Sequence, residues 1–249
     1  MAEVLNFEHN GITVNATESP EAMGGLGDNV IGLIGTAPKA DPLIPRNAPF
    51  RINSFTTQAL LDPTGTEAGT LYHAVFQILK VVKVPVYVVI VEEGATPADT
   101  LNNVIGGIDP LTGRKLGLAA LGSVPEDLTI IGAPGFTSTK AVAGEFASFG
   151  KRIKARVVLD GKDAAVADQV TYSQELGGAE LGFDRCLLVH NMPSVYSKAA
   201  KKNVFLSPSS LAIAALAKVK QWESPGNQVT FAEDVSRVVE YNILDTSRS

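Results

Sequence analysis

The sequence predicts an α/β fold: a mostly parallel sheet with helices on both faces, preceded by an extended N-terminal arm. Short apolar runs rich in β-branched residues, such as Val86–Val91 (VYVVIV), alternate with segments of helical periodicity. Each helical segment is long enough to cross back over a sheet, which favours parallel pairing. The strand candidates are apolar at nearly every position, so both faces of the sheet should be covered.

The strands and helices are predicted to alternate along the chain. Pro85 ends one helix, Ser54 or Thr56 caps another, and the last helix is capped by serine and stopped at Ser224-Pro225-Gly226. Residues 37–53 are expected to form a long proline-rich connection. The predicted strands span residues 29–36, 86–91, 127–132, 155–159 and 183–189, and the predicted helices span 54–61, 70–82, 138–154, 163–176 and 209–222.

Residues 1–20 have the pattern of an extended arm. Val4, Phe7, Ile12 and Val14 are separated by polar residues, with no helical cap. Such a strand cannot bury its apolar side alone, so it must pair with a sheet in its own chain or in a neighbour, and both options stay open. Residues 21–245 are expected to form the α/β body, with a possible sub-domain around 37–125, and residues 246–249 a short tail.

The amino-acid composition of the chain argues against several classes of function. The chain has 249 residues, 45% hydrophobic, and a formal net charge of −5 without a basic stripe, which argues against nucleic acid and anionic lipid as partners. The single cysteine, Cys186, permits no disulfide within one chain and is expected to be a small buried hydrophobe. Neither a leader pattern nor a long apolar run is present, so a soluble protein of the cytosol, with no membrane partner, is expected.

The sequence does not match the motifs of several common enzyme classes. The glycine cluster at 23–28 precedes a strand instead of following one, so it does not match a dinucleotide fingerprint. Gly161-Lys162 has Arg156 and Asp163 at the positions where a phosphate loop needs glycine and serine or threonine. No Gly-x-Ser-x-Gly occurs, and His9, His73 and His190 lack partners at metal-ligand spacing.

One acid/base constellation remains at the predicted strand ends. Asp160, Asp163 and His190 would converge if their loops leave neighbouring strands at the same edge, as in a small-molecule-binding α/β enzyme. The two aspartates serve equally as turn former and helix cap, and Glu92-Glu93 is explained as a solvated strand end. No catalytic residue, cofactor or metal ligand is therefore assigned.

Four segments, in order, resemble the tail sheath family of contractile phages and phage-derived bacteriocins. Residues 100–121 contain an Asn-x-Ile-Gly-Gly turn, a Thr-Gly dipeptide and a Gly-Leu-x-Ala-Leu helix. DLTIIGAPGF at 127–136 resembles the family's strand ending in Ala-Pro-Gly-Phe, and ARVVLD at 155–160 its next strand. The Pro-Ser helix from Pro208 and the Trp-x-Ser-Pro-x-Asn segment at 222–227 complete the pattern.

The resemblance implies a structural role without catalysis. Such subunits assemble in helical rings around a tail tube and contract to drive the tube through a bacterial envelope, while extended arms add strands to neighbouring subunits. The implied partners are other sheath subunits, the tail tube and the baseplate, and the implied location is a virion tail assembled in the host cytoplasm. Family members continue into a C-terminal domain beyond the point where this chain stops at Ser249, so this chain alone is expected to be monomeric or weakly associating.

Overall fold

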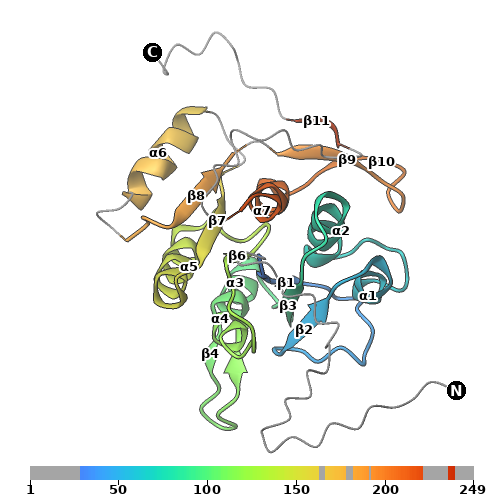
Figure 1. The fold of residues 1–249 in the computed structure, drawn as a ribbon, viewed down its shortest axis with the longest axis horizontal. Coiled ribbons are helices and arrows are strands. Elements are labelled where there is room, and N and C mark those ends of the chain that lie inside the picture. The colour runs from blue at the N-terminus through green and yellow to red at the C-terminus, as the bar shows by residue number, and fades with distance from the viewer. Residues whose placement is uncertain (1–28, 163–165, 178–181, 191, 221–234, 239–249) are drawn as a thin grey trace, which may run out of the picture.

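The fold is built on a six-stranded sheet in the order β2-β3-β1-β6-β7-β8 (Figure 1). The structure is a computed structural model that describes residues 29–162, 166–177, 182–190, 192–220 and 235–238. The predicted arm with Val4, Phe7, Ile12 and Val14 lies outside the described residues, and so does Asp163.

Four pairings in the sheet are parallel, and only β2 runs antiparallel, against β3. A second sheet is antiparallel, in the order β10-β9-β11, and β4 and β5 form a separate hairpin. The main sheet consists of β1 (Ile31–Thr36), β2 (Pro49–Ile52), β3 (Val86–Val91), β6 (Ile130–Gly132), β7 (Arg156–Asp160) and β8 (Cys186–Val189). The other strands are β4 (Gly107–Ile108), β5 (Lys115–Leu116), β9 (Pro193–Ser197), β10 (Lys202–Phe205) and β11 (Val235–Val238).

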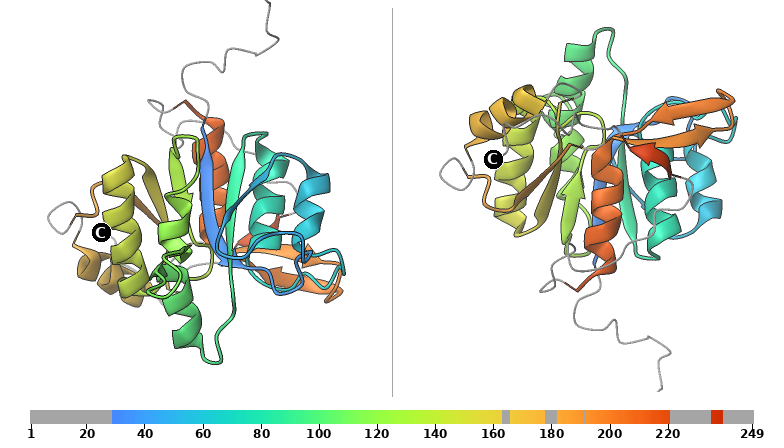
Figure 2. Two further views of the ribbon diagram at one scale, coloured as in Figure 1. Left: turned by 90° about the horizontal axis from the view of Figure 1, so that it is seen from below. Right: turned by 90° about the horizontal axis from the view of Figure 1, so that it is seen from above.

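Helices cover both faces of the main sheet (Figure 2), which confirms the predicted fold class. Helices α2 and α7 pack on one face, and α3, α4 and α5 on the other. The helical segments are α1 (Phe55–Gln58), the 3₁₀ turn η1 (Ala59–Leu61), α2 (Leu71–Val81), α3 (Pro97–Ile105), α4 (Gly117–Leu121), α5 (Lys140–Ile153), α6 (Val166–Leu176) and α7 (Pro208–Lys218).

The sheet separates two hydrophobic cores, and β3 shows why its sequence is apolar throughout. Val88 and Ile90 face the core under α2 and α7, whereas Val89 and Val91 face the core under α4 and α5. All six residues of β3 are buried. A strand covered on both faces must be apolar at odd and even positions alike, which explains the unbroken apolar run.

Two predictions about strands need correction. The predicted connection at residues 37–53 contains β2, because a four-residue edge strand is too short to produce a periodic pattern, and Pro49 is tolerated at its start. The strand predicted at 183–189 begins only at Cys186. It is the far edge of the sheet, where Leu187 is 41% exposed and Cys186 is only half-buried.

Helix α7 is held at both ends by the side chains of Asn29, which precedes β1, and Asp160 of β7. At its carboxyl end, the buried Asn29 amide donates to the carbonyls of Ala217 (3.0 Å) and Val219 (2.9 Å). At its amino end, the Ser209 N–H donates to the Asp160 carboxylate at 2.9 Å, and the Ser207 side chain makes no capping bond. The predicted serine cap is therefore wrong, because a buried helix start is satisfied by the acceptor that the fold brings to it.

We expect Asn29→Ala to lower the free energy of unfolding by about 1–3 kcal/mol, because buried carbonyls at the end of α7 lose their donor. Urea denaturation followed by circular dichroism measures the change. Lys218→Ala, exposed at the same end of α7, is the matched control and should stay within about 0.5 kcal/mol of the parent protein. Equal losses in both variants would contradict the role assigned to Asn29.

Candidate functional site

Asp160 occupies the position where an α/β enzyme would place a reactive group, at the carboxyl end of β7, but its carboxylate is used in structure. It is 3% exposed. One oxygen accepts from the Gly135 N–H at 2.9 Å and the Thr137 hydroxyl at 3.0 Å. The other accepts from the Ser207 hydroxyl and the Ser209 N–H. These bonds join β7 to the β6–α5 loop and to α7, so the carboxylate is a buried cross-link.

The surroundings of Asp160 are fixed as well. The Thr137 side chain accepts from the Asp160 N–H at 2.7 Å, and the Tyr172 hydroxyl donates to the Thr137 carbonyl at 2.8 Å. Burial, together with the nearby negative charge of Asp160, raises the pKa of Tyr172 to about 12. The tyrosine therefore stays protonated and remains a hydrogen-bond donor at every physiological pH.

His190 lies on the neighbouring strand end, as the sequence predicts, because Asp160 pairs with Val189 in the β7–β8 register. Its imidazole packs tightly on Gly161: a Cβ added to Gly161 would lie 2.0 Å from His190 Nδ1. The third predicted member, Asp163, lies outside the described residues. The structure thus brings Asp160 and His190 to adjacent strand ends, but it engages the Asp160 carboxylate elsewhere.

The crevice at the carboxyl ends of β1, β3 and β6 is the usual ligand position in a doubly wound sheet. A cavity of about 530 Å³ lies there, and neither Asp160 nor His190 lines it. Its only charged lining residue is Glu93. Its walls are formed by Thr36, Gly69, Thr70, Glu93, Gly94, Ala95, Thr96, Pro97, Thr100, Leu101, Gly135 and Phe136. The set contains no acid and base in mutual reach.

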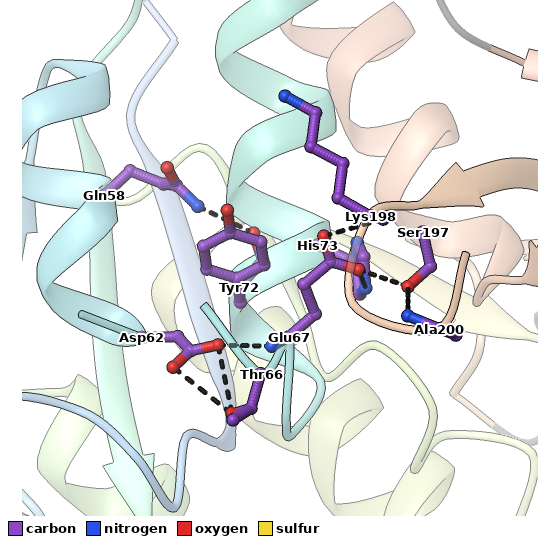
Figure 3. A network of polar contacts seen from close by, with 9 residues as sticks. All are labelled: Gln58, Asp62, Thr66, Glu67, Tyr72, His73, Ser197, Lys198 and Ala200. Atoms are coloured by element: carbon purple, nitrogen blue, oxygen red, sulfur yellow. Dashed lines mark hydrogen bonds and ion pairs between the residues drawn. The ribbon is translucent and has the colours of Figure 1, made fainter. Parts of the chain in front are cut away.

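A second polar cluster centres on Glu67 and connects the loop before α2 to the second sheet (Figure 3). The Glu67 carboxylate accepts from the Ser197 hydroxyl at 2.5 Å and the Lys198 N–H at 3.2 Å. His73 Nε2 lies 3.5 Å from the same carboxylate. Glu67 itself adopts a φ of 56°, and its N–H donates to the buried Asp62 carboxylate, which also binds Thr66. The cluster attaches the end of β9 to the start of α2.

The arrangement of this cluster is unlike that of a hydrolytic triad. In a triad the imidazole lies between the serine hydroxyl and the acid. Here the Ser197 hydroxyl donates directly to Glu67, and His73 approaches the same acid from α2. Sequence analysis missed the cluster because Glu67 and Ser197 lie 130 positions apart and no local pattern links them. The geometry supports a structural contact between β9 and the start of α2.

A hairpin formed by β4 and β5 projects from the body and is the most exposed apolar feature described (Figure 1). Leu111 at its turn is 94% exposed and Ile108 is 67% exposed. The Asp109 side chain accepts from the Leu111 N–H at 2.9 Å and from the Thr112 hydroxyl, which orders the turn. The turn is therefore ordered and holds the Leu111 side chain in solvent.

Glycines at the base of this hairpin explain the Ile-Gly-Gly and Gly-Leu motifs. Gly106 has a φ of 63°, and a Cβ there would lie 2.2 Å from the Leu116 carbonyl oxygen. Gly117 has a φ of 51°, and a Cβ there would lie 2.5 Å from the Asn103 carbonyl oxygen. The backbones of α3 and of the β5–α4 junction approach too closely for any side chain.

The described residues offer little for other kinds of site. Among them, no group of three or more His, Cys, Asp or Glu side chains is placed to hold a metal ion. None of the helices in the described ranges combines the length and hydropathy that spanning a bilayer demands. Burial raises the pKa of the Cys186 thiol to about 12, with a further contribution from Asp184, so the thiol stays protonated.

The fold and its polar groups define an α/β domain whose buried carboxylates serve as structural cross-links. No protein-family model matches the sequence, and a search of curated proteins found no match. Among solved structures, the chain is similar to the sheath protein in a cryo-EM structure of an extracellular contractile injection system, the PVC sheath complex in its contracted state. The TM-score is 0.53 at 12% sequence identity, over 90% of this chain and 55% of that one. The chain therefore has a sheath-like fold and spans about half the length of the sheath chain that it matches.

Substitution of Asp160 separates a structural role from a catalytic one. We expect Asp160→Ala to lower the free energy of unfolding by at least about 3 kcal/mol, because buried N–H and O–H donors lose a charged acceptor. Denaturant titration measures the loss, and Glu93→Ala at the exposed strand-end cavity is the control. A fully stable Asp160→Ala variant would contradict the assignment.

The Glu67 cluster predicts a pH-dependent stability. Burial lowers the pKa of His73 below its usual 6.5, although the charge of Glu67 opposes this shift. The unfolded chain therefore binds a proton more readily than the folded one, so stability falls as the pH drops below about 6.5 towards the lowered pKa. We expect His73→Gln to make the decline between pH 7 and 5 shallower, as measured by urea midpoints.

His190 is the other histidine among the described residues, so His190→Gln is the variant with which His73→Gln is compared. An unchanged decline in His73→Gln, or an equal change in both variants, would show that His73 is not the group responsible.

Proposed function

We propose that this protein is a structural subunit of a contractile sheath of the phage-tail type, which assembles helically around a tail tube and contracts to drive the tube through a bacterial envelope. The observation that carries the proposal is the sheath-like fold over 90% of the chain. The four sequence segments that resemble tail sheath proteins support it independently. On this proposal the protein is not an enzyme and needs no cofactor.

The proposed partners are other sheath subunits, together with the tube and baseplate, in a virion tail assembled in the host cytoplasm. The projecting hairpin supports a contact with a second copy of the chain, because Leu111 is 94% exposed on an ordered turn. The alternating residues Val4, Phe7, Ile12 and Val14 are proposed to form the strand that pairs with a neighbouring subunit. Contraction would be a two-state rearrangement of such interfaces, with no nucleotide consumed.

The alternative is a small-molecule-binding α/β enzyme that uses Asp160, Asp163 and His190. It has less support, because the buried Asp160 carboxylate already binds donors from the β6–α5 loop and α7. A general base at this position would first have to give up those bonds. The cavity at the strand ends also lacks a pair of acid and base side chains.

Negative-stain electron microscopy with sizing chromatography tests the proposal, on this chain and on the same chain extended by the C-terminal portion of a sheath subunit. We expect hollow tubes or rings from the extended chain and small species from this chain alone. Leu111→Asp in the extended chain should reduce assembly while leaving unfolding within about 0.5 kcal/mol of the parent. Failure of both chains to assemble at any salt or protein concentration would overturn the proposal.

A further inference from the structure

The negative charge of the chain is concentrated in one segment. Residues 1–28 contain Glu3, Glu8, Glu18, Glu21 and Asp28 and neither lysine nor arginine. The whole chain has 26 acidic and 21 basic residues, so the remainder carries 21 of each sign. The entire formal excess of −5 therefore lies in the first 28 residues, which we call the acidic segment.

A basic cavity lies at the amino ends of the parallel strands, the end opposite the crevice discussed above. Its volume is about 570 Å³, and three cations line it against the single acid Asp127. The lining residues are Asn29, Asp127, Leu128, Thr129, Ile153, Lys154, Arg156 and Arg185. Lys154 and Arg156 come from the junction between α5 and β7, and the fold adds Arg185, the residue before β8.

The backbone fixes the positions of the three cations. Lys154 ends α5 in a left-handed conformation, with a φ of 61°. The Arg156 N–H donates to the Thr129 carbonyl at 2.8 Å where β7 begins, and the Arg185 guanidinium donates to the Lys154 carbonyl at 3.2 Å. Within the described ranges, no carboxylate forms an ion pair with Lys154 or Arg185. Cations often complement a helix carboxyl end, but Arg156 and Arg185 lie outside α5, so the helix dipole does not account for the cluster.

The acidic segment is joined to the described part of the chain at Asn29, which lines this cavity. Asn29 is 4% exposed, held by its bonds to the end of α7. Asp28 immediately precedes Asn29 in the sequence, and Glu21 and Glu18 lie further towards the N-terminus. An extended chain spans at most about 3.3–3.6 Å per residue, which sets how far these carboxylates can reach. Because the segment is tethered, its carboxylates meet the cavity intramolecularly, at an effective concentration of the order of millimolar.

We propose that the acidic segment binds in cis to the basic cavity of its own chain, with Glu18, Glu21 and Asp28 supplying carboxylates to Lys154 and Arg185. This inference goes beyond the proposed sheath function and does not depend on it. In a sheath subunit the contact would have a regulatory consequence: the segment would be held on its own subunit until a neighbour competes for it.

Carbodiimide cross-linking of the intact protein tests the proposal, because the reagent joins a carboxylate to a lysine only where the two are in contact. Peptide mass spectrometry should find Lys154 linked to Glu18, Glu21 or Asp28. Lys140, exposed at the opposite end of α5 about 21 Å away, is the matched control lysine and should remain unlinked to these residues. The yield at Lys154 should fall as salt rises from about 0.01 M to 1 M, where the Debye length shrinks from about 30 Å to about 3 Å.

Variants test whether the contact depends on the charge of Arg185, and isotope labelling tests whether the bound segment belongs to the same chain or to a second copy. Arg185→Gln should lower the Lys154 yield by about threefold, as expected for one partly exposed ion pair, whereas Arg46→Gln at the other end of the strands should not. In an equal mixture of ¹⁵N-labelled and unlabelled protein, a cis contact gives links only between peptides of the same label.

Three results would overturn the proposal. The first is a Lys154 yield no higher than that of Lys140. The second is a yield unaffected by salt and by Arg185→Gln. The third is mixed-label links in statistical proportion, which would assign the cavity to the acidic segment of a second copy.

Discussion

The buried carboxylate of Asp160 connects three parts of the fold that are far apart in sequence. Its bonds to Gly135 and Thr137 hold the β6–α5 loop, and its bonds to Ser207 and Ser209 hold the start of α7. Since α7 packs with α2 over one face of the sheet, this contact and the Asn29 bonds at the other end of α7 anchor that layer. A buried charge is tolerated only when its acceptor positions are filled, and here the backbone and hydroxyl donors fill them.

The same contact shows how far sequence reasoning reaches. The order of the five parallel strands of the main sheet followed from local patterns, because strands such as β3 are apolar throughout and helices such as α2 carry apolar residues at helical spacing. Helix α3 and the short strands of the other two sheets were not predicted. The capping of α7 did not, because its acceptor is 49 positions earlier in the chain, at a distance that no local pattern encodes. The short edge strand β2 and the bond between Glu67 and Ser197 were missed for the same reason: their partners are fixed by the tertiary fold alone.

The sequence predicted where the candidate strand-end site lies, but it did not predict the chemical role of its residues. Sequence placed Asp160 and His190 at neighbouring strand ends, which the β7–β8 register confirms. The sequence left open whether Asp160 is a reactive group or caps a helix. Its burial and its four hydrogen bonds favour the capping role. The helix that it caps is α7 and not the helix that follows it in the sequence. The Asp160 carboxylate is therefore a structural cross-link in a domain whose fold is sheath-like.

The position of β1 has a mechanical consequence. It is the strand that directly continues the acidic segment, and it is paired on both sides, with β3 over six positions and with β6 over three. A pull applied through residues 1–28 along the axis of β1 would load both parallel ladders in shear, so that many hydrogen bonds resist together. A tether attached to an edge strand would instead peel its bonds one at a time. Residues 1–28 thus join the body at a strand that is paired on both sides and is therefore suited to transmit tension.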